Sequence, residues 1–253
     1  MTVVVKLGGR VQSDPRLGNA VRELWVSSGN ALCIVHGGGD EVTALQRQLG
    51  REPTFINGRR VTTDDDVDLV RMVLSGSANK RLVASLASFG LPAVGVSGED
   101  GGLLPAEPID PATLGKAGKP VIPQTRIIET LLSGGFLPVI SPVASDASSS
   151  GGALNVNGDD AAAAIAAALK ADLWMIADVP GVLDEEGALI PQLDDAQMQA
   201  LVDAGTVNKG MFAKLEAGFT ALQRGSPSVR VASIEAFSSV SSGTFLSLTP
   251  SMK

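Results

Sequence analysis

Short apolar runs alternate along the chain with longer segments that have helical periodicity. Residues 3–7 (VVVKL) and 31–35 (ALCIV) are mostly β-branched or aliphatic runs that stop at glycine clusters, the pattern of buried parallel strands. Between them, residues 16–28 carry apolar side chains at i, i+4, i+7 and i+8, which predicts an amphipathic helix. These positions are Leu17, Val21, Leu24 and Trp25. The beginning of the chain therefore predicts a strand–helix–strand unit.

The same alternation continues toward the C-terminus. Further helices are expected over residues 40–49, 79–89, 161–170, 195–204 and 214–224. Further strands are expected over residues 93–97, 137–141, 173–177, 229–232 and 244–248. Strands that alternate with helices form a mainly parallel sheet covered on both sides, so the predicted fold class is α/β, a three-layer α/β/α sandwich. The length of 253 residues fits one domain, with an N-terminal lobe over 1–152 and a C-terminal lobe over 153–253.

Three segments interrupt this pattern. Residues 103–123 contain five prolines, too many for a central strand, so we expect a surface excursion there. Residues 145–152 are small and polar, which predicts a mobile loop or a turn. The acidic run 64–66 follows two threonines, and this favours a helix start capped by Thr62 or Thr63 over a metal site.

Charge and composition exclude several classes of function. The net charge of −7 disfavours a nonspecific hold on nucleic acid or on anionic lipid. His36 is the only histidine and Cys33 the only cysteine, which argues against structural zinc, an internal disulfide and a Ser-His-Asp site. The N-terminal apolar stretch is too short for a signal peptide, and no apolar helical run approaches the roughly 20 residues that span a bilayer. We therefore expect a cytoplasmic protein.

Glycine clusters follow two of the predicted strands. Gly8-Gly9 and Gly37-Gly38-Gly39 lie where the carboxyl ends of parallel strands offer backbone N–H groups to a ligand. Because these residues lack a Cβ atom, the loops could cradle a phosphate or a carboxylate, although tight turns alone also explain them. Neither a P-loop nor a dinucleotide-binding fingerprint is present. A phosphate-binding enzyme with this sequence needs a different cradle.

Two lysines could supply charge to such a cradle. Lys6 is the only cation in an apolar strand, so we expect its ammonium to reach into a site rather than to snorkel to solvent. Lys214 follows Gly210-Met211 at the expected start of a helix, where a cation opposes the helix dipole. An anionic ligand would resolve that conflict, and an exposed helix lysine explains it equally well. Phosphoryl transfer needs positioning and charge neutralisation, which separated glycine loops and two lysines could provide.

Six motifs between residues 4 and 214 carry a more specific signal, and the likeness they carry extends from residue 3 to about residue 246. They are residues 4–9 (VVKLGG), 35–39 (VHGGG), 57–62 (NGRRVT), 155–159 (NVNGD), 177–183 (ADVPGVL) and 210–214 (GMFAK). In this order they resemble the amino acid kinase family, and most closely its members that act on N-acetyl-L-glutamate. The resemblance implies the amino acid kinase fold and transfer of the ATP γ-phosphoryl group to the side-chain carboxylate of N-acetyl-L-glutamate, in arginine biosynthesis.

The same resemblance implies roles for the residues at the centre of these motifs. Lys6 and Lys214 would neutralise the transferring phosphoryl group, and Asp159 would hold both lysines in place. Backbone N–H groups would bind the phosphoryl oxygens and the acceptor carboxylate. The residues concerned are Gly9 and Gly39 for the phosphoryl oxygens and Gly38 for the acceptor.

The resemblance also implies a binding site for each substrate. Arg60 would form a bidentate pair with the substrate α-carboxylate, which a lysine could not reproduce, and Asn155 would bind the acetamido and carboxylate end. ATP would bind in the C-terminal lobe, with Mg²⁺ carried by its phosphates rather than by a protein cage. The residues implied for the nucleotide are Asp178, Val179, Pro180, Gly181, Val182, Leu183, Thr206, Val207, Asn208, Gly210 and Met211.

Local explanations compete with these roles. Arg60 could be one of two surface arginines, Asp159 a helix cap and Asn155 a turn residue. His36 is interpreted as a packing residue beside the glycine loop, because a carboxylate acceptor is already ionised at pH 7 and needs no general base. Cys33, inside an apolar strand, is interpreted as a small buried residue.

Two other functions stay open at this point. A sibling enzyme acting on N-acetylaminoadipate or on carrier-bound aminoadipate differs by a methylene or by the blocking group, and one methylene provides only about 1–3 kcal/mol of discrimination. A non-catalytic nucleotide-binding relative would not need both lysines. The sequence departs from the family pattern at Lys209, where a second glycine is common. The few residues before Lys6 leave no room for the extra helix of arginine-inhibited hexamers, which predicts an arginine-insensitive homodimer.

Overall fold

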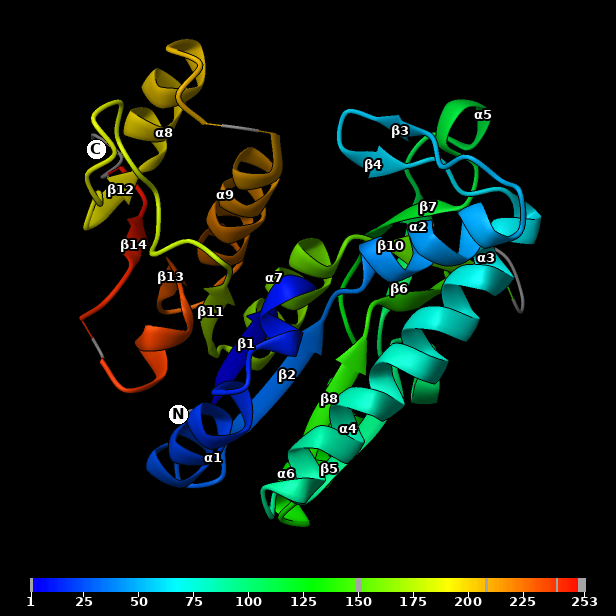
Figure 1. Cartoon of the computed structure of the whole chain (residues 1–253), viewed down its shortest axis with the longest axis horizontal. Coiled ribbons are helices and arrows are strands. Elements are labelled where there is room, and N and C mark those ends of the chain that lie inside the picture. The colour runs from blue at the N-terminus through cyan, green and yellow to red at the C-terminus, as the bar shows by residue number, and fades with distance from the viewer. Residues whose placement is uncertain (1, 149–151, 208, 240, 250–253) are drawn as a thin grey trace.

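One long sheet organises the protein. The computed structural model describes residues 2–148, 152–207, 209–239 and 241–249. Among these residues an eight-stranded sheet has the order β12-β14-β13-β11-β1-β2-β8-β5, and all of its pairings are parallel except β13 with β14 (Figure 1). Its strands are β1 (Val3–Leu7), β2 (Leu32–His36), β5 (Ala93–Ser97), β8 (Leu137–Ser141), β11 (Asp172–Ile176), β12 (Gln192–Asp194), β13 (Val229–Ala232) and β14 (Thr244–Ser247). The predicted mainly parallel sheet is confirmed.

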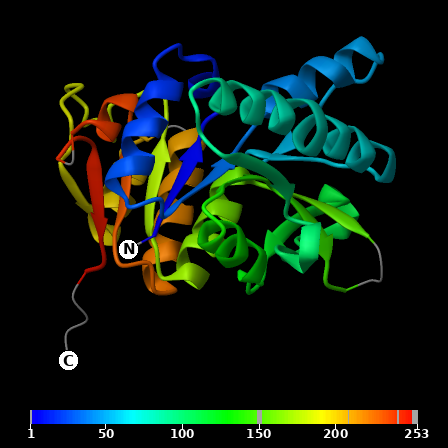
Figure 2. The same ribbon diagram turned by 90° about the horizontal axis from the view of Figure 1, so that it is seen from below.

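Helices cover both faces of this sheet, as the alternating pattern predicts (Figure 2). They are α1 (Leu17–Ser27), α2 (Gly39–Gln48), α3 (Asp64–Val70), α4 (Asn79–Ser88), α5 (Pro111–Leu114), α6 (Arg126–Ser133), α7 (Gly158–Leu169), α8 (Asp195–Asp203) and α9 (Lys209–Gln223). Short 3₁₀ helices are η1 (Arg10–Ser13), η3 (Asp100–Gly102) and η4 (Ile234–Phe237). In the described part of the chain, none of these helices combines the length and the apolar character that crossing a membrane requires.

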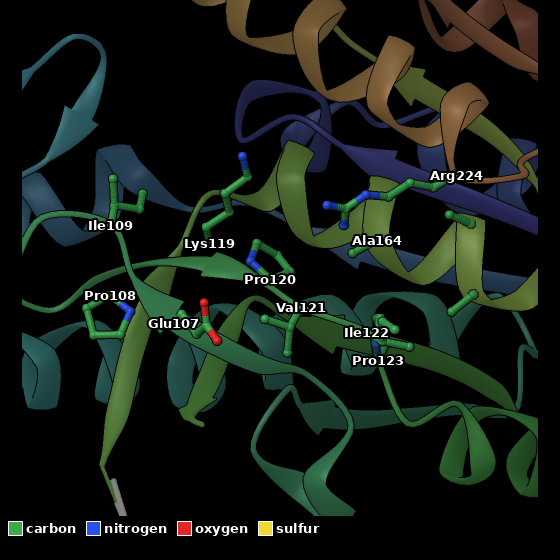
Figure 3. A pocket seen from close by; sticks show the side chains of 12 residues that line it. Glu107, Pro108, Ile109, Lys119, Pro120, Val121, Ile122, Pro123, Ala164 and Arg224 are labelled. Carbon is green, nitrogen blue, oxygen red and sulfur yellow. The ribbon is translucent and has the colours of Figure 1, made fainter. Parts of the chain in front are cut away.

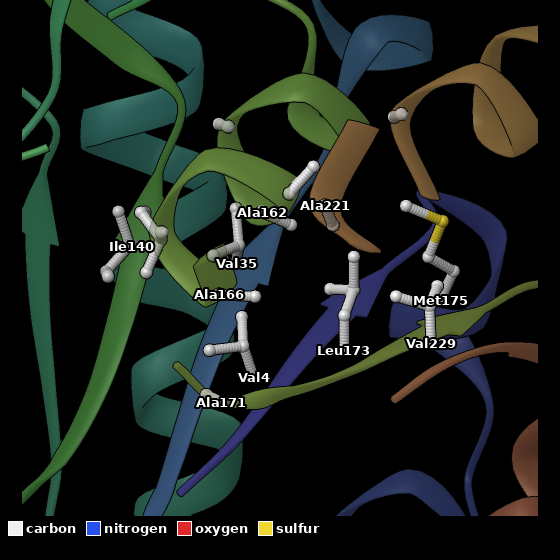
Figure 4. Packing of buried hydrophobic residues seen from close by; sticks show 14 of the residues in the cluster. Val4, Val35, Ile140, Ala162, Ala166, Ala171, Leu173, Met175, Ala221 and Val229 are labelled. Atoms are coloured by element: carbon white, nitrogen blue, oxygen red, sulfur yellow. The ribbon is translucent and has the colours of Figure 1, made fainter. Parts of the chain in front are cut away.

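The alternation of side chains along β1 separates two hydrophobic clusters. Val3 and Val5 pack with α1 and α4 on one face, whereas Val4 packs with α7 and α9 on the other. Figure 4 shows Val4 beside the alanines of α7, whose small side chains allow the helix to lie close to the sheet. Because strand side chains alternate with a period of two, Lys6 projects to the same face as Val4. Its ammonium is thereby directed toward the layer of α7 and α9.

A small second sheet corrects two of the predictions. Four strands, β6 (Pro105–Pro108), β7 (Ala117–Pro120), β9 (Val143–Asp146) and β10 (Ala153–Val156), form a closed arrangement in the order β10-β7-β6-β9. The surface excursion expected over 103–123 is therefore wrong, and Leu103, Leu104 and Ala106 are fully buried. Pro105, Pro108 and Pro120 are compatible with strands because they stand at strand ends, where the ladder needs fewer N–H donors, whereas Pro111 opens α5 and Pro123 lies outside the strands. The loop expected over 145–152 begins later, since residues 145–146 belong to β9, and 149–151 lie outside the described residues.

The two helices expected near residues 64 and 79 are one continuous rod. Thr63 caps α3 and forms a capping box with Asp66, so the predicted helix start is confirmed. The helix then continues through a π-helical segment, η2 (Arg71–Ala78), directly into α4. π-helical turns are rare and occur often at functional sites. From this segment Leu74 reaches the cavity described below.

Candidate active site

Three charged side chains from three elements meet beneath the carboxyl ends of the central strands. The ammonium of Lys6 on β1 lies 2.9 Å from Asp159 Oδ1, and that of Lys214 on α9 lies 3.0 Å from the same oxygen. Asp159 stands in the first turn of α7, where its backbone N–H donates to the side chain of the capping residue Asn157. Lys6 and Lys214 are each only 8% exposed and Asp159 only 7%. Two lysines more than 200 positions apart therefore share one carboxylate.

This cluster holds more positive than negative charge. Although burial alone would raise it, the pKa of Asp159 is lowered to about 2 by the charges and hydrogen bonds of the two lysines. Burial and the neighbouring Lys6 lower the pKa of Lys214, while Asp159 opposes that shift. With one carboxylate between two ammonium groups, the cluster has capacity for an additional anion. The alternative of an exposed Lys214 is wrong, because α9 begins five residues earlier and its second turn packs Lys214 against α7.

The two glycine loops lie side by side above the lysines. β1 and β2 are paired in register up to Leu7 and His36, so Gly9 and the loop 37–39 leave the sheet together. A Cβ atom on Gly37 would lie 3.9 Å from the Gly9 nitrogen, and one on Gly158 would lie 3.5 Å from Cε of Lys6. Side chains at these two glycine positions would narrow the space through which a ligand reaches Lys6 and the backbone amides. The two loops predicted to cradle an anion therefore lie next to each other and close to Lys6.

A cavity of about 280 Å³ opens over these loops. Its lining combines the amide-bearing loops, one buried lysine, two arginines and a few apolar side chains. The predicted site residues that line it are Lys6, Gly9, Gly38, Gly39, Arg60 and Asn155, and the other lining residues are Gly37, Asp40, Phe55, Gly58, Arg59, Leu74, Pro142, Val156, Asn157 and Gly158. Six of the eight residues predicted for catalysis and acceptor binding thus face one space, and the other two form the adjoining charged cluster.

Arg60 provides a second cationic group on the far side of this cavity. It lies on β4 (Arg59–Arg60), which pairs with β3 (Phe55–Ile56) in a short hairpin, and it is 9% exposed. Its Nη2 donates to the carbonyl of Gly39 and to Thr43 Oγ1, both at 2.8 Å, and its Nη1 donates to Gln46. No carboxylate of the described residues lies within 4.0 Å of the guanidinium. The surface-arginine explanation is wrong, because Arg60 is a buried cation whose charge is open to a ligand.

Asn155 and His36 occupy supporting positions. Asn155, on β10, donates from Nδ2 to Thr62 Oγ1 at 3.0 Å and lines the cavity. His36 Nδ1 donates to the carbonyl of Gly37 at 2.9 Å, and its Nε2 accepts from Asn79 at 3.1 Å. Burial lowers the pKa of His36, which favours the neutral ring. The packing role expected for His36 beside the glycine loop matches this geometry.

Comparison with known proteins decides the family. The family model described as "Amino acid kinase family" matches residues 1–233. The chain belongs to the amino acid kinase family. Among curated relatives of this kinase, the acetylglutamate kinase of Geobacillus kaustophilus is 43% identical over 235 residues, covering 92% of this chain and 90% of the relative. The acetylglutamate kinase of Rubrobacter xylanophilus is 41% identical over 229 residues, with 89% and 87% covered.

Solved structures agree with this assignment. The Streptococcus mutans protein smu.665 superposes with a TM-score of 0.86 at 27% identity, covering 97% of the kinase and 98% of that chain. Carbamate kinase from Giardia lamblia bound to AMP-PNP superposes with a TM-score of 0.72 at 14% identity, with 98% of both chains covered. At 14% identity, the similarity to the Giardia protein shows the fold alone. Together they confirm the amino acid kinase fold.

The residues expected at the nucleotide are placed less completely. A second cavity of about 340 Å³ shares Gly58, Arg59 and Asn157 with the first and is also lined by α8 and α9. Among the predicted nucleotide residues that the structure describes, Val207 is the one that lines it. Gly210 and Met211 lie in the first turn of α9, Thr206 precedes that helix, and Asn208 lies outside the described residues.

The loop over residues 178–183 follows β11 and lines neither of these two cavities. Asp178 accepts a hydrogen bond of 2.9 Å from Arg10, and Val182 donates through its backbone N–H to Thr244 Oγ1. Gly181 has a φ of +156° and would place a Cβ 2.6 Å from Leu189. Val179, Pro180 and Leu183 belong to the same turn, and Leu183 forms a bridge with Leu189. The predicted nucleotide residues are thus divided between this loop and the start of α9.

A larger cavity lies elsewhere in the described part of the kinase. It measures about 760 Å³ and is formed by β6, β7, the loop that follows β7, α7 and the C-terminal end of α9 (Figure 3). Prolines and aliphatic side chains dominate its lining, with Glu107, Lys119 and Arg224 as the charged groups. Of the predicted site residues within the described ranges, none lines it. Size alone would select this cavity, whereas the charged cluster and the glycine loops select the smaller one.

Sequence reasoning missed the residues that lie behind Arg60. Gln46 and Asp66 are both buried and connect Arg60 to the start of α3. A usable signal existed in the periodicity of α2, because Gln46 follows Val42 by four residues and so shares its buried face. Arg59 was also missed as a partner of Asp160, to which it donates at 2.7 Å, tying the β3–β4 hairpin to α7.

Proposed function

We propose that this kinase transfers the γ-phosphoryl group of ATP to the side-chain carboxylate of N-acetyl-L-glutamate and forms N-acetyl-L-glutamyl 5-phosphate in arginine biosynthesis. The observation that carries the proposal is the convergence of Lys6 and Lys214 on Asp159 beside a cavity that also contains Arg60. The acetylglutamate kinases that are about 40% identical over nine-tenths of the chain support it. A binding module without turnover would not need two buried lysines around one carboxylate.

The geometry accounts for phosphoryl transfer without a general base. At pH 7 the acceptor carboxylate is already ionised, so the protein has to align two anions and to neutralise the charge on the moving phosphoryl group. Lys6 and Lys214 supply that neutralisation, and Asp159 fixes where their ammonium groups lie. The amides of Gly9 and Gly39, both of which line the cavity, would bind phosphoryl oxygens.

The acceptor lies on the other side of the glycine loops in this proposal. The amide of Gly38 would hold the reacting carboxylate, Arg60 the α-carboxylate and Asn155 the acetamido end. The cavity of about 280 Å³ is large enough for a small acylated amino acid and leaves the phosphoryl group at the lysine end. Two carboxylates held at two separate cationic ends fix the direction of the substrate. The reacting carboxylate is thereby presented in line with the phosphoryl group.

In this proposal the metal ion binds to the nucleotide rather than to the protein. Within the described residues there is no cluster of three or more acidic, histidine or cysteine side chains suited to a metal ion. The family resemblance implies that Mg²⁺ is carried by the phosphates of ATP, where it would neutralise part of their charge. The second cavity beside α8 and α9 is the expected approach for the nucleotide. The C-terminal lobe, 153–253, would thus bind ATP, and the N-terminal lobe, 1–152, the acyl amino acid and the partner of a homodimer.

An ATP-dependent hydroxamate assay with a panel of acidic acceptors tests the proposal. Hydroxylamine traps an acyl phosphate, so the assay reports turnover and acceptor identity together. We expect the highest kcat/KM with N-acetyl-L-glutamate and a lower value with N-acetyl-L-aminoadipate, whose extra methylene must fit the same cavity. A higher kcat/KM with the aminoadipate derivative would replace the proposed acceptor. No turnover with any acceptor would refute the kinase reaction.

Replacement of Arg60 by lysine should weaken acceptor binding. We expect R60K to raise KM for N-acetyl-L-glutamate roughly 10- to 100-fold, because an ammonium cannot reproduce a planar guanidinium that also bonds Gly39, Thr43 and Gln46. KM for ATP should stay within about twofold. Steady-state kinetics with each substrate varied in turn measures both values. The matched control is R47K, an exposed arginine of α2, and an R60K variant with unchanged acceptor KM would contradict the assignment.

Cytoplasmic location and homodimer assembly are proposals that follow from the family resemblance. Light scattering on the purified chain tests the assembly, and addition of arginine to the hydroxamate assay tests the expected insensitivity. A hexamer, or strong inhibition by arginine, would contradict this part of the proposal.

A further inference from the structure

A buried glutamine stands directly behind Arg60. Gln46, on α2, is 2% exposed, and its side-chain oxygen accepts a hydrogen bond from Nη1 of Arg60. Its Nε2 donates to Asp66 Oδ1 at 3.0 Å. Because the carboxylate of Asp66 accepts the amide N–H, the amide oxygen must face Arg60. The orientation of Gln46 is thus determined by its two neighbours.

The second member of this chain is itself fixed in place. Asp66 is the third residue of α3, and its Oδ2 accepts from the backbone N–H and the hydroxyl of Thr63. Arg51 donates to the other oxygen of Asp66 at 3.4 Å. Hydrogen bonds to its charged form lower the pKa of Asp66, against the effect of burial. A satisfied buried network of this kind restricts side-chain motion.

The hydrogen-bond partners of Arg60 do not neutralise its positive charge. The two groups that accept from Nη2 of Arg60 are the carbonyl of Gly39 and Thr43 Oγ1, and the group that accepts from Nη1 is the amide of Gln46. All three acceptors are neutral. The carboxylate of Asp66 is separated from Arg60 by the length of the Gln46 amide group. A guanidinium has five N–H donors, of which these contacts use three, so two remain for a ligand, while Asp66 and Asp40 act on the guanidinium only through longer-range attraction.

We propose that Gln46 is a positioning residue that holds the Arg60 guanidinium for the α-carboxylate of the acceptor without neutralising its charge. This inference rests on the proposed function, in which Arg60 binds that carboxylate. A glutamate at position 46 would set a carboxylate against Asp66 in place of the N–H donor, and in its ionised form it would pair with Arg60 and compete with the substrate. A leucine would leave the guanidinium without the contact that orients Nη1. Both substitutions should weaken only the binding of the α-carboxylate end of the substrate.

A pair of acceptors that differ at that end provides the test. 4-Acetamidobutanoate is N-acetylglutamate without the α-carboxylate, and it retains both the acetamido group and the reacting carboxylate. Q46L and Q46E are compared with the unchanged kinase on both acceptors, with 4-acetamidobutanoate used as a substrate or as a competitive inhibitor. Q48L, at an exposed glutamine of the same helix, is the matched control. Thermal unfolding of each variant shows whether it is folded.

The expected result is selective for the α-carboxylate. Q46L and Q46E should raise KM for N-acetyl-L-glutamate about tenfold or more, with kcat and KM for ATP within twofold. The constants for 4-acetamidobutanoate should not change, whereas a merely structural role of Gln46 would weaken both acceptors equally. Equal losses on both acceptors, or an unchanged KM for N-acetyl-L-glutamate in a folded Q46L, would overturn the inference. Failure of the unchanged kinase to act on N-acetyl-L-glutamate is a separate result that refutes the proposed function and this inference with it.

Discussion

Lys6→Ala and Lys214→Ala should each lower kcat about a hundredfold. The two ammonium groups and Asp159 form a cluster with one net positive charge, and removal of either lysine leaves a neutral pair. The phosphoryl group then crosses between donor and acceptor with less charge stabilisation, and loss of one such group typically costs about 3 kcal/mol of transition-state stabilisation. The kcat of acyl phosphate formation at saturating substrates measures the effect. Lys119→Ala, at an exposed lysine of β7, is the matched control.

The double variant provides an additional test of this mechanism. Groups that act as one unit give non-additive losses, so K6A/K214A should be less impaired than the product of the two single effects. If either single variant keeps nearly full activity, the role assigned to that lysine is wrong. If the two losses multiply fully, the lysines act independently and Asp159 does not join them into one unit.

Asp159→Asn should cause the largest combined loss of activity and stability. An asparagine retains the shape of the side chain but leaves two lysines, each 8% exposed, without their shared anion. Breaking a buried ion pair by removal of one partner costs about 3–5 kcal/mol of folding free energy. We expect the free energy of unfolding, measured by urea denaturation, to decrease by that amount. The kcat should fall at least as much as in the single lysine variants. Asp65→Asn, at an exposed aspartate that pairs with Arg51, should change stability by less than about 1 kcal/mol.

The pH dependence of folding gives an independent signature of the same group. The pKa of Asp159 is about 2 in the folded protein and 3.8 as an ordinary aspartate, so the unfolded chain binds the proton first as the pH falls. The corresponding stabilisation, about 2 kcal/mol, is fully present above pH 3.8 and is lost between about pH 3.8 and pH 2. Asp159→Asn should lack that component of the acid transition. An acid transition that is identical in the two proteins would contradict the role of Asp159 as the shared counter-ion.

The regular part of the fold could be predicted because each element carries its own periodicity. The strand at 3–7 and the helix at 16–28 are visible in the spacing of their apolar residues, and the structure places β1 and α1 within one or two residues of those bounds. Residues 103–123 could not be predicted in the same way. Their strands are short and contain prolines, and only pairing with β9 and β10, which are distant in sequence, makes them part of a sheet.

The candidate site likewise contains residues that local sequence could predict and residues that it could not. Lys6 and the glycine loops could be found from local sequence, because a cation in an apolar strand and glycines after a strand are unusual wherever they stand. The partner of Lys214 could not be found from local sequence. The helix that carries Lys214 begins earlier than the sequence indicates, and the counter-ion of Lys214 lies 55 positions away on α7. The role of Gln46 was hidden for a similar reason. A single glutamine on a helix face has no meaning until the buried arginine beside it is known.

Local sequence thus determined the order of strands and helices, the face of β1 from which Lys6 projects, and the loops that can approach an anion. Only the tertiary structure decided which charges meet. The pairing of Lys6, Asp159 and Lys214, and the contact of Gln46 with Arg60, join segments that are separate along the chain. Local spacing encodes which side of an element faces the interior, whereas a buried charge takes its pKa and its partners from whichever distant groups the packed layers bring within a few ångströms.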